Sequence, residues 1–196
     1  MQQPGEEPLG WSNRHRRVAD FVIGVLERGG PLVPSVLAFE GERWIGLLMV
    51  RGHDAATKQR AFREAFRFVP AVGADRAMVV FDAYHRDAPA GGELELPAGG
   101  LAEDPHARDA IAMVSVGPDG FDLALLPYHL DDRGGVVVEP FHPRDARPLW
   151  MHHALAEAMA SPRGGALELV RLRLRGHSVQ VFDRSGRRRP RLRRGT

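Results

Sequence analysis

The stretch that decides the fold is Ala77-Met78-Val79-Val80-Phe81-Asp82-Ala83-Tyr84-His85. It is short and apolar, it is rich in residues that favour strands, and it shows no alternation with polar residues before Asp82. A run of this kind is typical of a strand that is buried on both faces. The stretch therefore predicts a central strand in a sheet that helices cover.

The residues before this strand predict a helix, a hairpin and a second helix, each bounded by residues that favour caps and turns. The expected elements are a helix from Ser12 or Asn13 to Gly29-Gly30, a hairpin with arms 35–39 and 43–51, and a helix from Asp54 to Pro70. The strand–helix–strand order over residues 43–84 is typical of a βαβ crossover. In such a unit we expect two neighbouring strands to run parallel.

The residues after the central strand begin with a stretch rich in proline and glycine, 86–109, which we expect to be a partly disordered loop. Further elements follow, again separated by proline and glycine. They are a hairpin with arms 110–116 and 121–126, a strand at 135–139, a helix from Pro148 to Pro162, and a hairpin with arms 166–175 and 178–183. The predicted fold class is α+β, with a mixed, mostly antiparallel sheet, one βαβ crossover and helices packed on the sheet.

Length and composition favour one globular domain. The chain has 196 residues, of which 43% are hydrophobic and 27% are charged, and this suits a single hydrophobic core. We expect a flexible N-terminus at 1–12, a single α+β domain at 13–183 and a disordered arginine-rich tail at 184–196.

Composition also argues against several classes of protein. No apolar run approaches the roughly 20 residues that a helix needs to cross a bilayer, so we expect no membrane partner. Residues 1–7 carry proline and acid where a secretory signal would be basic and then apolar, which favours a cytoplasmic location. The absence of cysteine excludes thiol catalysis, disulfides and cysteine-ligated metals.

The common short signatures of enzymes are missing. The chain has no phosphate loop that ends in Gly-Lys-Ser/Thr, no Gly-x-Gly-x-x-Gly, no Gly-x-Ser-x-Gly and no His-Glu-x-x-His. The sequence therefore predicts no cofactor, and it favours a non-catalytic protein over an enzyme.

Basic residues gather at the C-terminal end. Residues 184–196 hold seven arginines and no acidic residue, and the rest of the chain is slightly acidic. Residues 170–175 alternate strictly between aliphatic residues and arginine, which predicts a strand with three arginines on one face. Arginine pairs with phosphate in bidentate fashion and releases counterions, so this region is expected to bind a polyanion. The candidate binding residues are Arg171, Arg173, Arg175, Arg187, Arg188, Arg189, Arg191, Arg193 and Arg194.

These observations predict a binding or accessory protein that contacts RNA, DNA or an acidic protein through its basic C-terminal hairpin and tail. A second interpretation of the arginines is that they protect an exposed edge strand from aggregation. A structural subunit of a larger assembly is a further alternative, because the apolar hairpin over residues 110–126 could form an interface as readily as a core.

Histidines at strand ends favour a different function. His53, His85 and His129 each lie where an expected strand ends, and the only two tyrosines, Tyr84 and Tyr128, directly precede two of them. If these ends met at one edge of the sheet, imidazoles and nearby carboxylates could bind a metal or transfer a proton, as in a metal- or histidine-dependent hydrolase. The alternative is that polar residues mark the points where buried strands reach the surface.

A second group of histidines lies in and near the last expected helix. It consists of His152, His153, Glu157 and nearby His142. His153 and Glu157 are four residues apart and share a helical face, whereas adjacent histidines point about 100° apart on a helix. Only one of the two can join Glu157, so the pattern favours a solvated face or a surface ion pair over a metal site.

Overall fold

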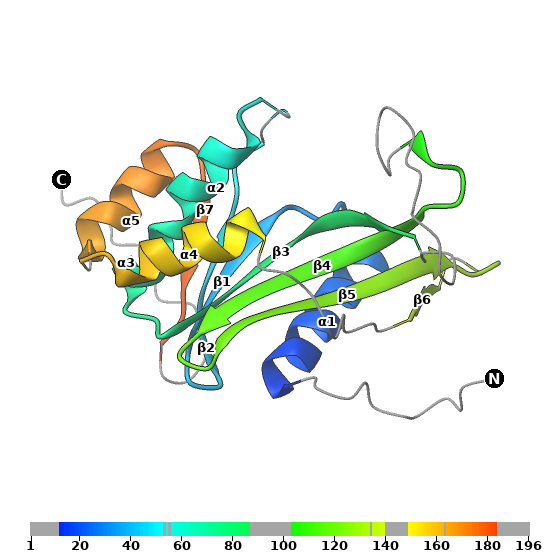
Figure 1. Cartoon of the computed structure of the whole chain (residues 1–196), viewed down its shortest axis with the longest axis horizontal. Coiled ribbons are helices and arrows are strands. Elements are labelled where there is room, and N and C mark those ends of the chain that lie inside the picture. Colours follow the sequence, from blue (N-terminus) through cyan, green and yellow to red (C-terminus); the bar gives the residue numbers. More distant parts are fainter. Residues whose placement is uncertain are drawn as a thin grey trace. The chain divides into compact units, whose positions relative to one another are not determined.

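The structure is a computed structural model that describes residues 12–52, 54, 56–86, 103–133, 135–139, 149–162 and 164–183. Figure 1 shows the helices and strands in the order of the chain. They are α1 (Asn13–Leu26), β1 (Ser35–Glu40), β2 (Arg43–Met49), α2 (Lys58–Phe66), α3 (Phe68–Val72), β3 (Arg76–His85), β4 (Arg108–Gly117), β5 (Gly120–Leu130), β6 (Val136–Val138), α4 (Trp150–Ala160), α5 (Gly165–Leu174) and β7 (Ser178–Val181).

The seven strands form one sheet in the order β6-β5-β4-β3-β1-β2-β7. β1 is antiparallel to both of its neighbours, β2 and β3, and β7 is antiparallel to β2. At the other edge, β6 is antiparallel to β5. The fold is therefore α+β, as the sequence predicted, and the sheet is antiparallel, whereas a mixed, mostly antiparallel sheet was expected.

The crossover between β2 and β3 differs in one respect from the prediction. The two strands run in the same direction because both are antiparallel to β1, but β1 lies between them, so they are not neighbours. The turn at Gly41, with φ +57°, pairs β1 with β2 along one edge. The other edge of β1 is then free to pair with β3, and the chain crosses β1 by way of α2 and α3.

The chain divides into two compact units. Unit 1 comprises Met1–Val33, Phe81–Met113 and Leu123–Ala146, and unit 2 comprises Pro34–Val80, Val114–Asp122 and Arg147–Thr196. Strands β3, β4 and β5 each contribute residues to both units. The single domain expected at 13–183 stays a prediction. So do the flexible N-terminus and the disordered tail, because residues 1–11 and 184–196 lie outside the described residues.

Unit 2 has an aromatic, close-packed core. Helix α3 contacts α4, α5, β1 and β2, and α2 contacts α4. Phe62, Phe66 and Phe68 are fully buried. Gly46 of β2 has no room for a side chain, because a Cβ there would lie 2.6 Å from Cζ of Phe68. Helices α3 and α5 with strands β1, β2 and β7 line one of the two candidate pockets, and α2, the segment after β2 and the C-terminal end of α5 line the other.

Unit 1 contains α1, β6 and the parts of β3, β4 and β5 assigned to it. The helix expected from Ser12 or Asn13 is present as α1, and the Ser12 hydroxyl accepts the His15 N–H at 3.4 Å. Val18 and Val22 of α1 are fully buried. Arg108 and Glu139 form an ion pair at 2.6 Å.

The prediction of a strand over residues 166–175 is wrong, because Gly165–Leu174 form helix α5. Alanine, leucine, glutamate and arginine are good helix formers, and Val170 is the only β-branched residue of this segment. The alternation of arginine with aliphatic residues is short, and within α5 only Leu172 is buried. The second arm of the expected hairpin is present as the shorter strand β7.

The helix expected from Asp54 to Pro70 is in fact two helices, α2 and α3. Asp54 precedes α2, and its carboxylate accepts the Thr57 N–H at 2.8 Å. Pro70 lies in the first turn of α3, where a backbone N–H is not needed, so the proline does not end the helix. Instead, α3 ends at Gly73, which adopts φ +75°.

The remaining expected elements are present. The hairpin over residues 110–126 forms β4 and β5, the strand at 135–139 forms β6, and the helix after Pro148 forms α4. Of the loop expected at 86–109, residues 87–102 lie outside the described residues, and β4 already begins at Arg108.

Candidate functional site

Two pockets of similar size lie among the described residues of unit 2. The first has a volume of about 320 Å³, and we call it the arginine pocket, because its lining includes Arg51, Thr57, Arg60, Glu64, Arg175 and His177. The second has a volume of about 390 Å³, and we call it the aliphatic pocket; its lining includes Glu40, Arg43, Ile45, Val72, Leu169 and Phe182. Both volumes fall in the range of small-molecule sites, so the chemistry of the lining must distinguish them.

Three segments that are distant in the sequence form the arginine pocket. Arg51 follows strand β2, and Arg60 and Glu64 lie on α2. Arg175 is the C-cap of α5, and His177 lies in the turn that leads into β7. Gly176 adopts φ +93° in this turn, and His177 N–H donates to the Leu172 carbonyl at 3.1 Å.

The pairing of β2 with β7 brings the first and third segments together. In this antiparallel register Met49 lies opposite Ser178. One step further along, Val50 is opposite His177, so Arg51, which follows Val50, lies near His177. The contact is a hydrogen bond in which Arg51 N–H donates to Nδ1 of His177 at 2.9 Å.

His177 is a neutral histidine with a buried donor. Its side chain is 4% exposed. Burial lowers the pKa of His177, the charges of Arg51 and Arg175 lower it further, and the charge of Glu64 acts in the opposite direction. Because Nδ1 accepts a hydrogen bond, the single ring hydrogen of the neutral form is on Nε2. This Nε2 is buried and has no hydrogen-bond partner among the described residues, which costs about 1–3 kcal/mol when nothing else fills the role.

The arginine pocket has more positive than negative charge. Among the described residues that line it are three guanidinium groups and one carboxylate, that of Glu64, which pairs with Nε of Arg175 at 2.9 Å. Arg51 and Arg60 have exposed side chains in this pocket. The arrangement combines an excess of cations with a buried N–H donor, and an anion would satisfy both.

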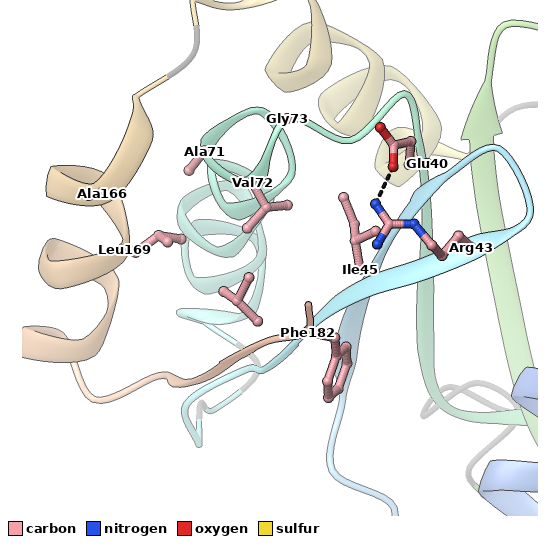
Figure 2. A pocket seen from close by; sticks show the side chains of 10 residues that line it. Glu40, Arg43, Ile45, Ala71, Val72, Gly73, Ala166, Leu169 and Phe182 are labelled. Carbon is pink, nitrogen blue, oxygen red and sulfur yellow. Dashed lines mark hydrogen bonds and ion pairs between the residues drawn. The ribbon is translucent and has the colours of Figure 1, made fainter. Parts of the chain in front are cut away.

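The aliphatic pocket offers no comparable group. Figure 2 shows the side chains of Ile45, Leu169 and Phe182 around the hollow, with Glu40 and Arg43 joined by an ion pair at one side. Arg43 Nη1 also donates to the carbonyl of Asp183 at 3.4 Å. The one positive charge that lines this pocket therefore faces a carboxylate in the same lining.

The arginines predicted from the sequence have different positions from those expected. Arg175 lines the arginine pocket, Arg171 pairs with Glu168 at 3.3 Å, and Arg173 Nη2 donates to the Val179 carbonyl at 3.3 Å. On a helix Arg171 and Arg175 share a face and Arg173 does not, so the predicted row of three on one strand face is wrong. The other candidates lie outside the described residues: Arg187, Arg188, Arg189, Arg191, Arg193 and Arg194.

Tyr128 of unit 1 lies close to three other titratable side chains, those of Tyr84, Asp82 and Asp109. Burial raises the pKa of Tyr128, and the charges of Asp109 and Asp82 and the neighbouring Tyr84 raise it further. Asp82 is affected by burial first and by Asp109 second, and both raise its pKa. These four side chains therefore lie close to one another.

His85 and His129 each follow one of these tyrosines, so strand alternation directs them to the opposite face of the sheet. His53 lies outside the described residues. Within the described ranges, no group of three or more His, Cys, Asp or Glu side chains could hold a metal ion. The hydrolase hypothesis built on His53, His85 and His129 stays a prediction.

The histidines of α4 do not form a common site with Glu157. His152 is buried, accepts Leu149 N–H at Nδ1 (2.8 Å), and its Nε2 lies 3.0 Å from the Asp122 carbonyl, to which it donates. Burial lowers the pKa of His152. Glu157 pairs with Arg63 at 3.6 Å, and His153 is exposed. His142 lies outside the described residues.

Sequence reasoning missed His177, Arg51 and Arg60 as functional residues. His177 lies in an expected turn, Arg60 in an expected helix, and Arg51 at the end of the expected strand 43–51. The available signal was a histidine directly before one expected strand and an arginine at the end of another. That signal becomes informative only when the pairing of the two strands is known.

Comparison with models of protein families, with curated proteins and with solved structures finds no match to this chain. Among the helices within the described ranges, none combines the length and the apolar character needed to cross a bilayer.

Proposed function

We propose that the protein is a non-catalytic binding protein that contacts the phosphates of a nucleic acid through a basic face on unit 2. The observation that carries this proposal is a group of exposed arginines on α2, on α5 and after β2. We call it the basic face, and it consists of Arg51, Arg60, Arg63, Arg67, Arg171 and Arg175.

Ion pairs hold the two helices of the basic face together. Glu64 of α2 pairs with Arg175 at 2.9 Å. Glu168 of α5 pairs with Arg67 at 3.8 Å and with Arg171 at 3.3 Å. A third carboxylate, that of Glu157 on α4, pairs with Arg63 at 3.6 Å. The six arginines of the basic face outnumber these three carboxylates, and all six are exposed. The carboxylates of Glu64 and Glu168 are largely covered, whereas their guanidinium partners are exposed, so each guanidinium can offer its remaining N–H donors to phosphate oxygens.

Phosphate suits this arrangement better than a carboxylate from an acidic protein. The donors of the arginine pocket come from three segments, and a tetrahedral phosphate offers acceptor oxygens in several directions. Guanidinium groups also bind phosphate in bidentate fashion. Contacts of this type position a nucleic acid by its backbone and read no base sequence.

The test measures the affinity of the full chain for a fluorescent single-stranded oligonucleotide at several salt concentrations. The logarithm of the affinity should fall linearly with the logarithm of salt concentration, by a slope of about −0.7 per phosphate contacted. Deleting residues 184–196 removes seven further arginines, and Arg60→Gln removes one charge from the basic face. Each change, made separately, should make the dependence of affinity on salt less steep. Arg43→Gln removes the same charge from the aliphatic pocket and should leave the slope unchanged.

Two results would contradict the proposal. One is the absence of oligonucleotide binding at low salt, and the other is binding that does not respond to salt. Binding to polyglutamate but not to the oligonucleotide would replace the nucleic acid with an acidic protein as the partner.

A further inference from the structure

His177 gives the clearest indication of a ligand in the arginine pocket. Its Nδ1 is used by Arg51 N–H, and its Nε2 is buried with no acceptor among the described residues. His152, the other buried histidine among the described residues of unit 2, has both ring nitrogens in hydrogen bonds. An acceptor supplied by a ligand would complete His177 in the same way.

The surroundings of His177 favour an acceptor with negative charge. The ring is close enough to Arg51, Arg175 and Glu64 for their charges to act on it, and it shares the pocket lining with Arg60. A neutral acceptor would satisfy Nε2, but an anion would also be attracted by the guanidinium groups of the lining. The first turns of α2 also line this pocket, and the N-terminal end of a helix adds partial positive charge.

The amount of charge and the size of the pocket favour a phosphate monoester. Among the described lining residues, three carry a guanidinium group and one carries a carboxylate. A phosphate monoester carries roughly −1.5 to −2 at neutral pH, whereas a phosphate within a nucleic acid strand carries about −1. The volume of about 320 Å³ leaves room for a sugar beside the phosphate.

We propose that the arginine pocket binds a terminal phosphate monoester, with Nε2 of His177 donating to a phosphate oxygen and the guanidinium groups of Arg51, Arg60 and Arg175 surrounding it. This inference rests on the proposed function, because the phosphorylated end of a nucleic acid strand would supply the group. It adds a preference for strand ends to a surface that otherwise binds any phosphate backbone.

The experiment compares two oligonucleotides that are identical except for a 5′-phosphate or a 5′-hydroxyl. Each is titrated into the full chain at the same ionic strength, with ribose 5-phosphate and inorganic phosphate as small probes. The 5′-phosphorylated strand should bind about tenfold more tightly, the gain expected from one charge-assisted hydrogen bond. Inorganic phosphate and ribose 5-phosphate should shift the NMR signals of the His177 ring, and chloride should not.

The outcomes separate this inference from the proposed function. Equal affinity for the two strands, with no effect of inorganic phosphate on His177, would overturn the terminal phosphate site and would leave binding to the phosphate backbone intact. A shift of the His177 signals by both phosphate probes, without binding of either strand, would support the pocket and overturn the nucleic acid function.

Matched variants test the residues themselves. His177→Asn keeps an acceptor for Arg51 N–H and removes the Nε2 donor, so it should abolish the advantage of the 5′-phosphate. Arg60→Gln changes an exposed side chain that the fold does not need, and it should reduce the same advantage. Arg43→Gln, in the aliphatic pocket, should preserve it. If both His177→Asn and Arg60→Gln kept the full preference for the 5′-phosphate, the proposal would be wrong.

Discussion

The arginine pocket and the aliphatic pocket have similar volumes, about 320 and about 390 Å³, and lie in the same unit. Helix α5 contributes to both, through Leu169 to one and through its C-cap Arg175 to the other. They differ in whether their polar groups have partners. In the aliphatic pocket Arg43 pairs with Glu40, whereas in the arginine pocket a buried N–H lacks an acceptor and cations exceed carboxylates.

This difference shows why volume is a poor guide to function. A hollow lined by aliphatic side chains and a closed ion pair is stable when empty, because no buried polar group in it lacks a partner. A hollow that leaves a buried donor without an acceptor carries a cost that a ligand removes. The arginine pocket is therefore the candidate site, although it is the smaller of the two.

The largest effect is expected from Leu172→Ala, because Leu172 is the residue of α5 that is fully buried. The change should lower the free energy of unfolding by about 2–5 kcal/mol, through lost burial and a new cavity. Since α5 lines both pockets, phosphate binding should weaken at the same time. Leu174→Ala on the same helix is the control, because Leu174 is 75% exposed and its loss should change stability by less than about 0.5 kcal/mol. Equal effects of the two variants would show that α5 is not anchored as described.

The next effect concerns pH. The pKa of His177 and that of His152 are both lowered from 6.5, mainly by burial, so near and below that pH the unfolded chain binds more protons than the folded one. Stability should be fully retained above about pH 6.5 and should fall as the pH decreases, by up to about 1.4 kcal/mol per pH unit for each histidine. Urea unfolding between about pH 7 and about pH 5.5 measures this slope.

Phosphate should distinguish the two histidines in that experiment. The groups that face His177 are Glu64 from α2, Arg51 after β2 and Arg175 at the end of α5. A phosphate bound among them would favour the charged ring, raise the pKa of His177 and reduce its share of the slope. The contribution of His152 to the slope should not change, because both of its ring nitrogens already have hydrogen-bond partners. A slope that phosphate does not change would contradict the site at His177.

Much of the fold could be predicted because most segments carry one dominant pattern. The apolar spacing of α1 and the turn residues between β4 and β5 each favour a single structure. Residues 165–174 carry two signals, since the alternation of arginine and leucine favours a strand and the helix propensity of the same residues favours a helix. Packing decided between them: Leu172 is buried, and α5 contacts α3 and β7.

The site was less predictable than the fold, because its key contact is not local. Arg51 and His177 are far apart in the sequence, and the hydrogen bond between them depends on the pairing of β2 with β7. The sequence indicated that a basic surface lies near the C-terminal end, and Arg175 does line the pocket. It gave no sign that a buried histidine stands beside it, since a single histidine in a turn has no pattern of its own.

The smallest effects are expected when methionine replaces one alanine in the lining of each pocket. Ala71 of α3 lines the aliphatic pocket, and Ala61 of α2 lines the arginine pocket. Ala71→Met should fill apolar space and raise the free energy of unfolding by about 0.5–1 kcal/mol, without changing the preference for a 5′-phosphate. Ala61→Met should bring no such gain, because its neighbours are charged, and it should weaken binding of the 5′-phosphate by occupying the space of the ligand. Thermal unfolding and the oligonucleotide titration measure both variants. If Ala71→Met weakened phosphate binding as much as Ala61→Met, the aliphatic pocket would be part of the binding site, and the distinction between the two pockets would fail.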